Sequence, residues 1–365
     1  MADAFPSLDG LALAVAHLGG ADGRADGTWC DVTAGDDGHV TLTLVDARTA
    51  PGPVARALRR ALAGLGPQRS AAGTLDALDG AARAIPGAAG TGALCVTVDP
   101  AGVVGWSAAG SGPPSAAGPD GVRALAGDTG APLGCAEGAA TQAQEPLAAG
   151  TTVVLGICPD LAATAVATVL AGNHGLAPVA LAAALEEAAL DGVLDGALGD
   201  SGGGPGRHAL VLARLLPGPL EQRLPADPRR LSAVRRAAAA WSAAAALSED
   251  AAADLQLLLS EAATNAVEHA YRASASGEFV YSVRRRRDGG VRVVVQDFGR
   301  WRPPPAEPGY RGRGLAVIHN LAQEVTLEHT DHGTRISFVV PGDAQPLGER
   351  PLAGVTQGWK PGPER

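Results

Sequence analysis

Lysine is almost absent from this sequence, and several other residue types are scarce. Only Lys360 among the 29 basic residues is a lysine, so a mechanism that needs a catalytic lysine is excluded. Aromatic residues make up 3% of the chain, so its cores must be built mainly from alanine, leucine and valine. The four cysteines are scattered, with no C-x-x-C pair. This spacing excludes a disulfide framework and a zinc site.

Long apolar runs are absent as well, since none approaches the roughly 18 residues that a membrane span requires. The N-terminal segment carries no basic region ahead of an apolar stretch, unlike a secretory signal. We therefore expect a cytoplasmic protein that does not bind membranes. The formal net charge of −9 makes the chain a poor non-specific binder of nucleic acid.

The length and composition predict about two domains, because the 365 residues are 46% hydrophobic. Residues 217–228 contain four prolines and are predicted to be a linker. We therefore expect one domain at 8–216 and a second at 229–340. The tail at 341–365 is polar and rich in proline and glycine, so we expect it to be disordered.

Within these domains, segments rich in valine, leucine and threonine predict strands, and alanine-rich segments predict helices. Ser248 is a candidate N-cap of the longest helix, with Glu249 and Asp250 at its positive end. Helices are expected at 54–64, 74–84, 161–170, 178–190, 229–247, 248–272 and 314–323. Strands are expected within 9–48 and 91–109, and at 151–155, 210–215, 278–285, 290–296, 325–329 and 334–340.

Two polar residues on the longest predicted helix suit nucleotide chemistry. Glu261 and Asn265 are four residues apart, so they share one helix face among apolar neighbours. An amide oxygen can ligate Mg²⁺, and a carboxylate can accept a proton or hold a water molecule.

Three further motifs follow in the second half. The apolar strand 293–296 ends in Asp297-Phe298-Gly299, where an acid can accept a hydrogen bond from the adenine amine. The segment 311–315 (RGRGL) opens a helix, whose glycines and N-terminus favour phosphate groups. Gly333-Thr334 begins the last strand and offers a hydroxyl near the same pocket.

The order and spacing of these motifs resemble the N, G1, G2 and G3 boxes of the GHKL (histidine-kinase-like) ATPase fold, over roughly 229–340. Residues 260–271 (SEAATNAVEHAY) are similar to the anti-sigma-factor serine kinases. The resemblance implies a two-layer α/β sandwich that binds ATP, with Asn265 holding Mg²⁺, Glu261 as catalytic base and Asp297 reading adenine. The ATP-binding residues that it implies are Asn265, Asp297, Gly299, Gly312, Arg313, Gly314, Leu315 and Thr334. One departure is Trp301, which stands where the family has the second glycine of Asp-x-Gly-x-Gly.

Two other nucleotide interpretations fail. Asp-Phe-Gly also occurs in eukaryotic-type protein kinases, but those need an upstream strand lysine and a His-Arg-Asp loop, which this chain lacks. A histidine kinase needs a phosphoaccepting histidine on an upstream helix, and residues 229–250 contain none.

The first half resembles the SpoIIE-like branch of metal-dependent Ser/Thr phosphatases over about 8–216, which implies an α/β sandwich. The supporting motifs are GTWCDV at 27–32, LVDARTAPG at 44–52, AAGSGPP at 108–114, GAPLG at 130–134 and AGTTVVLGICPDL at 149–161. Carboxylates in that family hold two metal ions that activate a water molecule.

Most of those carboxylates are missing here. Thr28 stands at a metal aspartate, Cys158-Pro159-Asp160 replaces Thr-Asp-Gly, and Arg207-His208 replaces the terminal Asp-Asp. Asp46 matches one ligand, and Asp31 or Asp160 could serve only through a shift of register. Since hard divalent cations need several oxygen ligands, we expect a pseudophosphatase kept for binding or sensing.

These patterns lead to an ATP- and Mg²⁺-dependent serine/threonine kinase as the first hypothesis. It would phosphorylate an anti-anti-sigma (STAS) protein and control a sigma factor by partner switching, as a homodimer. Two alternatives stay open: an ATP-gated scaffold or anti-sigma binder without catalysis, and an active phosphoserine phosphatase.

Overall fold

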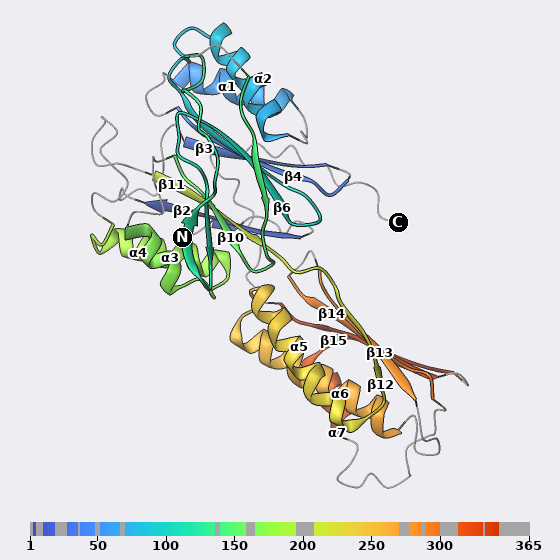
Figure 1. The fold of residues 1–365 in the computed structure, drawn as a ribbon. Coiled ribbons are helices and arrows are strands. Elements are labelled where there is room, and N and C mark those ends of the chain that lie inside the picture. Colours follow the sequence, from blue (N-terminus) through green and yellow to red (C-terminus); the bar gives the residue numbers. More distant parts are fainter. Residues whose placement is uncertain are drawn as a thin grey trace. The chain divides into compact units, whose positions relative to one another are not determined.

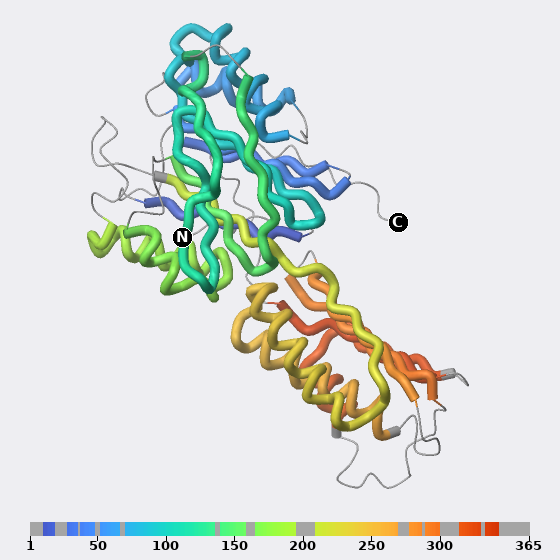
Figure 2. The backbone as a smooth tube through the Cα atoms, viewed as in Figure 1, coloured from blue at the N-terminus to red at the C-terminus, as the bar shows by residue number. Residues whose placement is uncertain are grey.

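The structure of the chain is a computed structural model (Figures 1 and 2). It describes residues 3–4, 10–18, 28–35, 37–47, 52–65, 70–135, 139–157, 165–194, 208–269, 277–286, 289–299, 313–330 and 333–342. The chain divides into two compact units, and the boundary falls between Leu215 and Leu216. The predicted tail at 341–365 lies outside the described residues from position 343 onward.

The described residues of the first unit form two antiparallel sheets. One has the strand order β1-β2-β11-β10-β7-β8, and the other has the order β3-β4-β5-β6-β9. The strands of the first sheet are β1 (Asp3–Ala4), β2 (Leu11–Leu18), β7 (Ser115–Gly118), β8 (Gly121–Ala124), β10 (Thr152–Leu155) and β11 (His208–Leu215). Those of the second are β3 (Thr28–Ala34), β4 (Val40–Asp46), β5 (Gly92–Val98), β6 (Val103–Ala109) and β9 (Ala143–Pro146).

The two sheets pack face to face, and helices cover their outer faces (Figure 1). Leu42, Leu94 and Trp106 from one sheet share a core with Val153 and Val211 from the other. Helices α1 (Gly52–Gly64) and α2 (Ala71–Ala84) bury an apolar stripe on the β3–β6 side, and α3 (Ala165–Gly172) and α4 (Pro178–Leu190) do so on the other sheet. This layering confirms the expected α/β sandwich.

The second unit is a single antiparallel sheet with the order β12-β13-β14-β16-β15. Helices α5 (Leu231–Ala244), α6 (Glu249–His269) and α7 (Arg313–Leu321) pack on one face of it (Figure 1). The strands are β12 (Leu220–Pro225), β13 (Glu278–Arg285), β14 (Val291–Asp297), β15 (Gln323–Thr330) and β16 (Gly333–Val340). The expected two-layer α/β sandwich is confirmed.

The start of α6 follows the predicted capping chemistry. The Ala251 N–H donates to Oγ of Ser248 at 3.2 Å, which satisfies one of the free donors of the first turn. The helix then buries Leu255, Leu258, Leu259 and Ala262 against the sheet, so its remaining faces carry the polar residues.

The predicted linker at 217–228 is wrong in its middle. Residues 220–225 form β12, which pairs with β13 along its whole length and belongs to the second sheet. Prolines can occupy the ends of an edge strand because the missing N–H is not needed there, and Pro225 is the last residue of β12. The second unit therefore begins before the expected 229.

No helix among the described residues combines the length and apolar character that crossing a membrane requires.

Candidate functional site

The first part of the site lies where α7 begins against α6. Glu261 and Asn265 project from the same face of α6, as their spacing predicts, and Gly314 in the first turn of α7 lies beside both. A Cβ atom on Gly314 would come within 2.6 Å of Oε2 of Glu261 and 3.5 Å of Nδ2 of Asn265. Only a residue without a side chain leaves this space open. The N-terminus of α7, whose first N–H groups have no acceptor within the helix itself, thus begins next to a carboxylate and an amide.

Asn265 is half-buried, and the nitrogen of its side-chain amide is buried without a partner among the described residues. Its Nδ2 atom has no hydrogen-bond partner among the described residues, and burying an unpaired polar group costs about 1–3 kcal/mol. The two ends of an amide differ only by a rotation, so the same position can present the oxygen. An oxygen aimed into such a space suits Mg²⁺, which prefers oxygen ligands. The residues present therefore fit a magnesium-bound nucleotide.

The second part of the site lies where β14 ends beside the start of β16. Asp297 is buried, with 6% of its surface exposed. Its Oδ1 atom accepts the N–H of Gly299 at 3.0 Å and the N–H of Thr334 at 3.2 Å. These bonds fix the carboxylate on the sheet face that the helices cover, because Asp297 continues the inward row of Val293 and Val295.

Burial raises the pKa of the Asp297 carboxyl above its ordinary value, while hydrogen bonds from Gly299 and Thr334 partly oppose the shift. A buried carboxylate favours a ligand group that donates a hydrogen bond over one that does not. The reason is that leaving a polar group without a partner costs more free energy in a buried site than in water. This is the property that an adenine amine would use.

The close approach of the two strands depends on Gly333. Its φ of +138° is a conformation that L side chains rarely adopt, and a Cβ there would lie 2.1 Å from the carbonyl oxygen of Asp297. Sequence analysis placed Gly333 at the start of the last strand but did not identify this role. The available signal was a glycine directly before the predicted strand 334–340.

The structure thus brings most of the predicted nucleotide residues to the helix-covered side of the sheet, since α6 packs on both β14 and β16. Gly299 and Thr334 surround Asp297, and Leu315 follows Gly314 in α7 with 36% of its surface exposed. Arg313 is the first residue of α7, and Gly312 lies outside the described residues.

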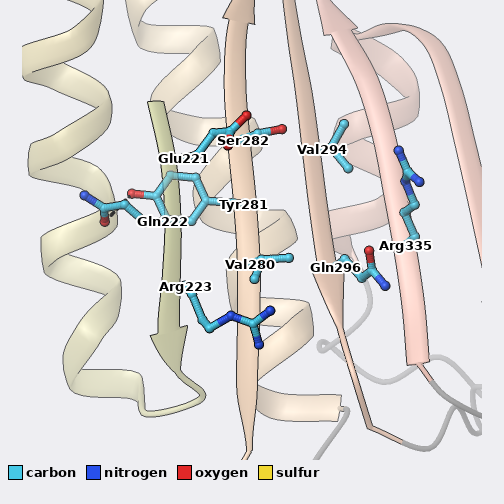
Figure 3. Close-up of a pocket in the computed structure, with 9 residues that line it drawn as sticks. All are labelled: Glu221, Gln222, Arg223, Val280, Tyr281, Ser282, Val294, Gln296 and Arg335. Carbon is cyan, nitrogen blue, oxygen red and sulfur yellow. Dashed lines mark hydrogen bonds between the residues drawn. The ribbon is translucent and has the colours of Figure 1, made fainter. Parts of the chain in front are cut away.

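A groove of about 400 Å³ lies on the other face of the same sheet (Figure 3). Its residues come from β12, β13, β14 and β16, and most of them alternate with the residues that face the helices. Gln222 and Tyr281 are the exceptions, since Tyr281 belongs to the helix-side core and its hydroxyl donates to Gln222. They are Glu221, Gln222, Arg223, Val280, Tyr281, Ser282, Val294, Gln296 and Arg335. The groove is therefore separate from the face that carries Asp297.

In the first unit, the two candidate metal-ligating acids that the structure describes, Asp31 and Asp46, lie on opposite faces of a sheet. In the β3–β4 pairing Thr28 is opposite Asp46, whereas Asp31 is opposite Thr43. Successive side chains of a strand alternate between faces, so positions 28 and 31 point to different sides. Asp160 and Arg207 lie outside the described residues, and His208 is the first residue of β11.

Comparison with known proteins identifies the class of the second unit. Residues 224–340 match the family model of the histidine kinase-like ATPase domain. This match confirms the ATPase domain expected from the sequence motifs, and it includes the last residues of β12.

A curated relative is the serine-protein kinase RsbW of Staphylococcus epidermidis, 27% identical over 135 residues, which cover 33% of this chain and 84% of the relative. A similar solved structure contains the RsbU and RsbW domains of Rv1364c from Mycobacterium tuberculosis, with 24% identity, a TM-score of 0.48, and coverage of 93% of this chain and 95% of that one. The phosphatase domain of SpoIIE from Bacillus subtilis, with part of its regulatory domain, has 13% identity, a TM-score of 0.41, and coverage of 59% and 70%.

The chain joins an α/β sandwich to a second unit that matches the histidine kinase-like ATPase domain, as the motifs of its second half predict.

Proposed function

We propose that the protein is an ATP-dependent serine/threonine protein kinase that phosphorylates an anti-anti-sigma (STAS) protein in a partner-switching system. The single observation that carries the proposal is the contact of Glu261 and Asn265 with Gly314 at the N-terminus of α7. It joins a candidate proton acceptor, a candidate magnesium ligand and the first backbone N–H groups of a helix at one place.

Each group has a distinct role in this proposal. Asp297 accepts a hydrogen bond from the adenine amine and so selects the base. Asn265 orients the magnesium-bound phosphates, and the first N–H groups of α7 bind phosphate oxygens. Glu261 accepts the proton of the incoming serine hydroxyl, a contribution of about 10²–10⁴-fold in rate. ATP supplies the phosphoryl group, whose transfer depends mainly on positioning and electrostatic stabilisation.

The choice of substrate is supported by the similarity of the second unit to a curated serine-protein kinase. A STAS protein is the partner that follows from the family resemblance of residues 260–271, and a sigma factor is the further partner. The homodimer stays a prediction.

Transfer of labelled phosphate tests the proposal. The full chain is incubated with labelled Mg-ATP and purified STAS proteins, and the labelled residue is identified by mass spectrometry. Label on a STAS serine or threonine, absent with the Asn265→Ala variant, is the expected result. ATP binding without transfer to any STAS protein would contradict the kinase and favour an ATP-gated scaffold.

A further inference from the structure

The edge of one sheet in the first unit holds a hydroxyl and a carboxylate in direct contact. Thr28 begins β3 and Asp46 ends β4, and the two residues are paired in register. The Thr28 hydroxyl donates to Oδ1 of Asp46 at 3.4 Å. Both side chains belong to the row of Cys30 and Leu44, which faces the other sheet.

On the neighbouring strand β5, the corresponding position of this row is a glycine, which has no side chain. Asp46 is paired with Gly92 of β5, and a Cβ atom on Gly92 would lie 3.1 Å from Cγ2 of Ile157. The chain that follows β10 therefore reaches the Thr28–Asp46 edge at Ile157. This edge brings residues from β3, β4, β5 and the segment after β10 to one place between the sheets.

Asp31 cannot join this place, because it belongs to the helix-facing side of the sheet. It is buried, with 5% of its surface exposed, and it lies opposite Thr43. The Thr43 hydroxyl contacts Sγ of Cys95 at 3.5 Å, within the layer that α1 and α2 cover. Burial raises the pKa of Cys95 to about 11, and the Asp31 charge adds to the shift. Asp31 is therefore a buried acid on the side of the sheet that α1 and α2 cover.

A shift of register does not rescue a metal site. Moving β3 by one residue against β4 would exchange the faces of all its side chains, which would bring Trp29 out of its helix-covered core. Within the described residues no group of three or more histidine, cysteine or acidic side chains could hold a metal ion. One carboxylate is too few for a hard divalent cation. Within the part of the first unit that the structure describes, the residues do not fit the two-ion centre of the resembling phosphatases.

We propose that Thr28 and Asp46 mark a disabled divalent-cation position, in which a hydroxyl has replaced one carboxylate and Asp46 is the surviving ligand. The carboxylate of Asp46 accepts a hydrogen bond from the neutral Thr28 hydroxyl, where a metal-binding site would hold a cation. An acid at position 28 would place two carboxylates side by side, and their repulsion would be relieved by a divalent cation. The inference concerns the first unit and is independent of the kinase proposal.

Calorimetric titration of Mn²⁺ into the nucleotide-free full chain tests the inference. Wild type is expected to bind no Mn²⁺, whereas Thr28→Asp should bind one ion at about millimolar concentration, the range of weak oxygen-ligand sites. Thr28→Asn, which has a similar shape without the charge, should not bind. Adding Asp46→Ala to Thr28→Asp should abolish the gain.

A melting experiment provides a second readout that needs no activity. Mn²⁺ should raise the melting temperature of the Thr28→Asp chain alone, since a ligand stabilises the folded state that binds it. Mn²⁺ binding by wild type that is lost in Asp46→Ala would overturn the inference. A Thr28→Asp chain with wild-type circular dichroism and no Mn²⁺ binding would overturn it equally.

Discussion

Gly314 lies directly against the carboxylate of Glu261, at a separation that leaves no room for a Cβ atom. The contact joins the start of α7 to the middle of α6, which are distant in sequence. Because the obstructing atom is the end of a flexible side chain, a larger residue would displace Glu261 and leave the fold intact. The contact therefore controls where this carboxylate points.

Gly314→Ala is expected to slow phosphate transfer by about 10²-fold, because small misplacements of a catalytic group have effects of this size. ATP binding should change much less. Gly80→Ala is the matched control, since Gly80 lies in α2 with open space around it. That variant should transfer phosphate normally and be more stable by about 1 kcal/mol. Equal transfer rates in the two variants would contradict the proposed role of the contact.

ATP binding should weaken as the pH falls from neutrality through the raised pKa of Asp297. Protonation removes the negative charge of the carboxylate, so the carboxyl group accepts hydrogen bonds from the two N–H groups and the adenine amine less strongly. Since the native pKa lies above the unfolded one, this protonation also stabilises the ATP-free unit, so the two effects have opposite signs. Melting curves with and without Mg-ATP across pH measure both.

Asp297→Asn is the control for this pH dependence. It should lose most of the ATP-induced rise in melting temperature at neutral pH, because the acceptor becomes partly a donor. An Asn variant with the wild-type rise would contradict the adenine assignment.

Asn265→Ala should separate stability from ligand binding. The amide nitrogen has no hydrogen-bond partner among the described residues, so its removal should change the free energy of unfolding by no more than about 1 kcal/mol. The ATP-induced stabilisation, in contrast, should disappear. Chemical denaturation with and without Mg-ATP checks both parts. A large loss of stability without nucleotide would indicate a structural role in place of a ligand role.

Gly333→Ala is expected to destabilise the second unit by more than about 3 kcal/mol, because the methyl group would overlap the backbone of Asp297. Gly289→Ala is the matched control, since Gly289 also has a positive φ but open space around it. It should lose only about 1–2 kcal/mol of stability from backbone strain. Denaturant melts of the two variants measure the difference, and equal losses would show that the close approach is not the cause.

The sequence predicted features that depend on local spacing. The shared face of Glu261 and Asn265 follows from helical periodicity, and the Ser248 cap follows from local hydrogen bonding, so both were found. Asp297 was placed at a strand end by its apolar neighbours and by the turn residues after it.

Features that depend on pairing between distant segments could not be predicted in the same way. Strand β12 is short and flanked by prolines, and only its pairing with β13 makes it a strand. The placement of Asp31 and Asp46 on opposite faces depends on the β3–β4 register, which composition does not reveal. The overlap at Gly333 likewise requires the backbone of another strand.

Single-turnover transfer from labelled Mg-ATP to a STAS serine, compared between wild type and Glu261→Ala, tests the central claim most directly. Glu261 contributes little to ATP affinity in this account, so the variant should bind ATP nearly as wild type does. Its transfer rate should fall by about 10²–10⁴-fold, because the serine hydroxyl loses its proton acceptor. An unchanged transfer rate in Glu261→Ala would contradict the assignment of Glu261 as the catalytic base. The absence of any transfer by wild type would contradict the kinase activity itself.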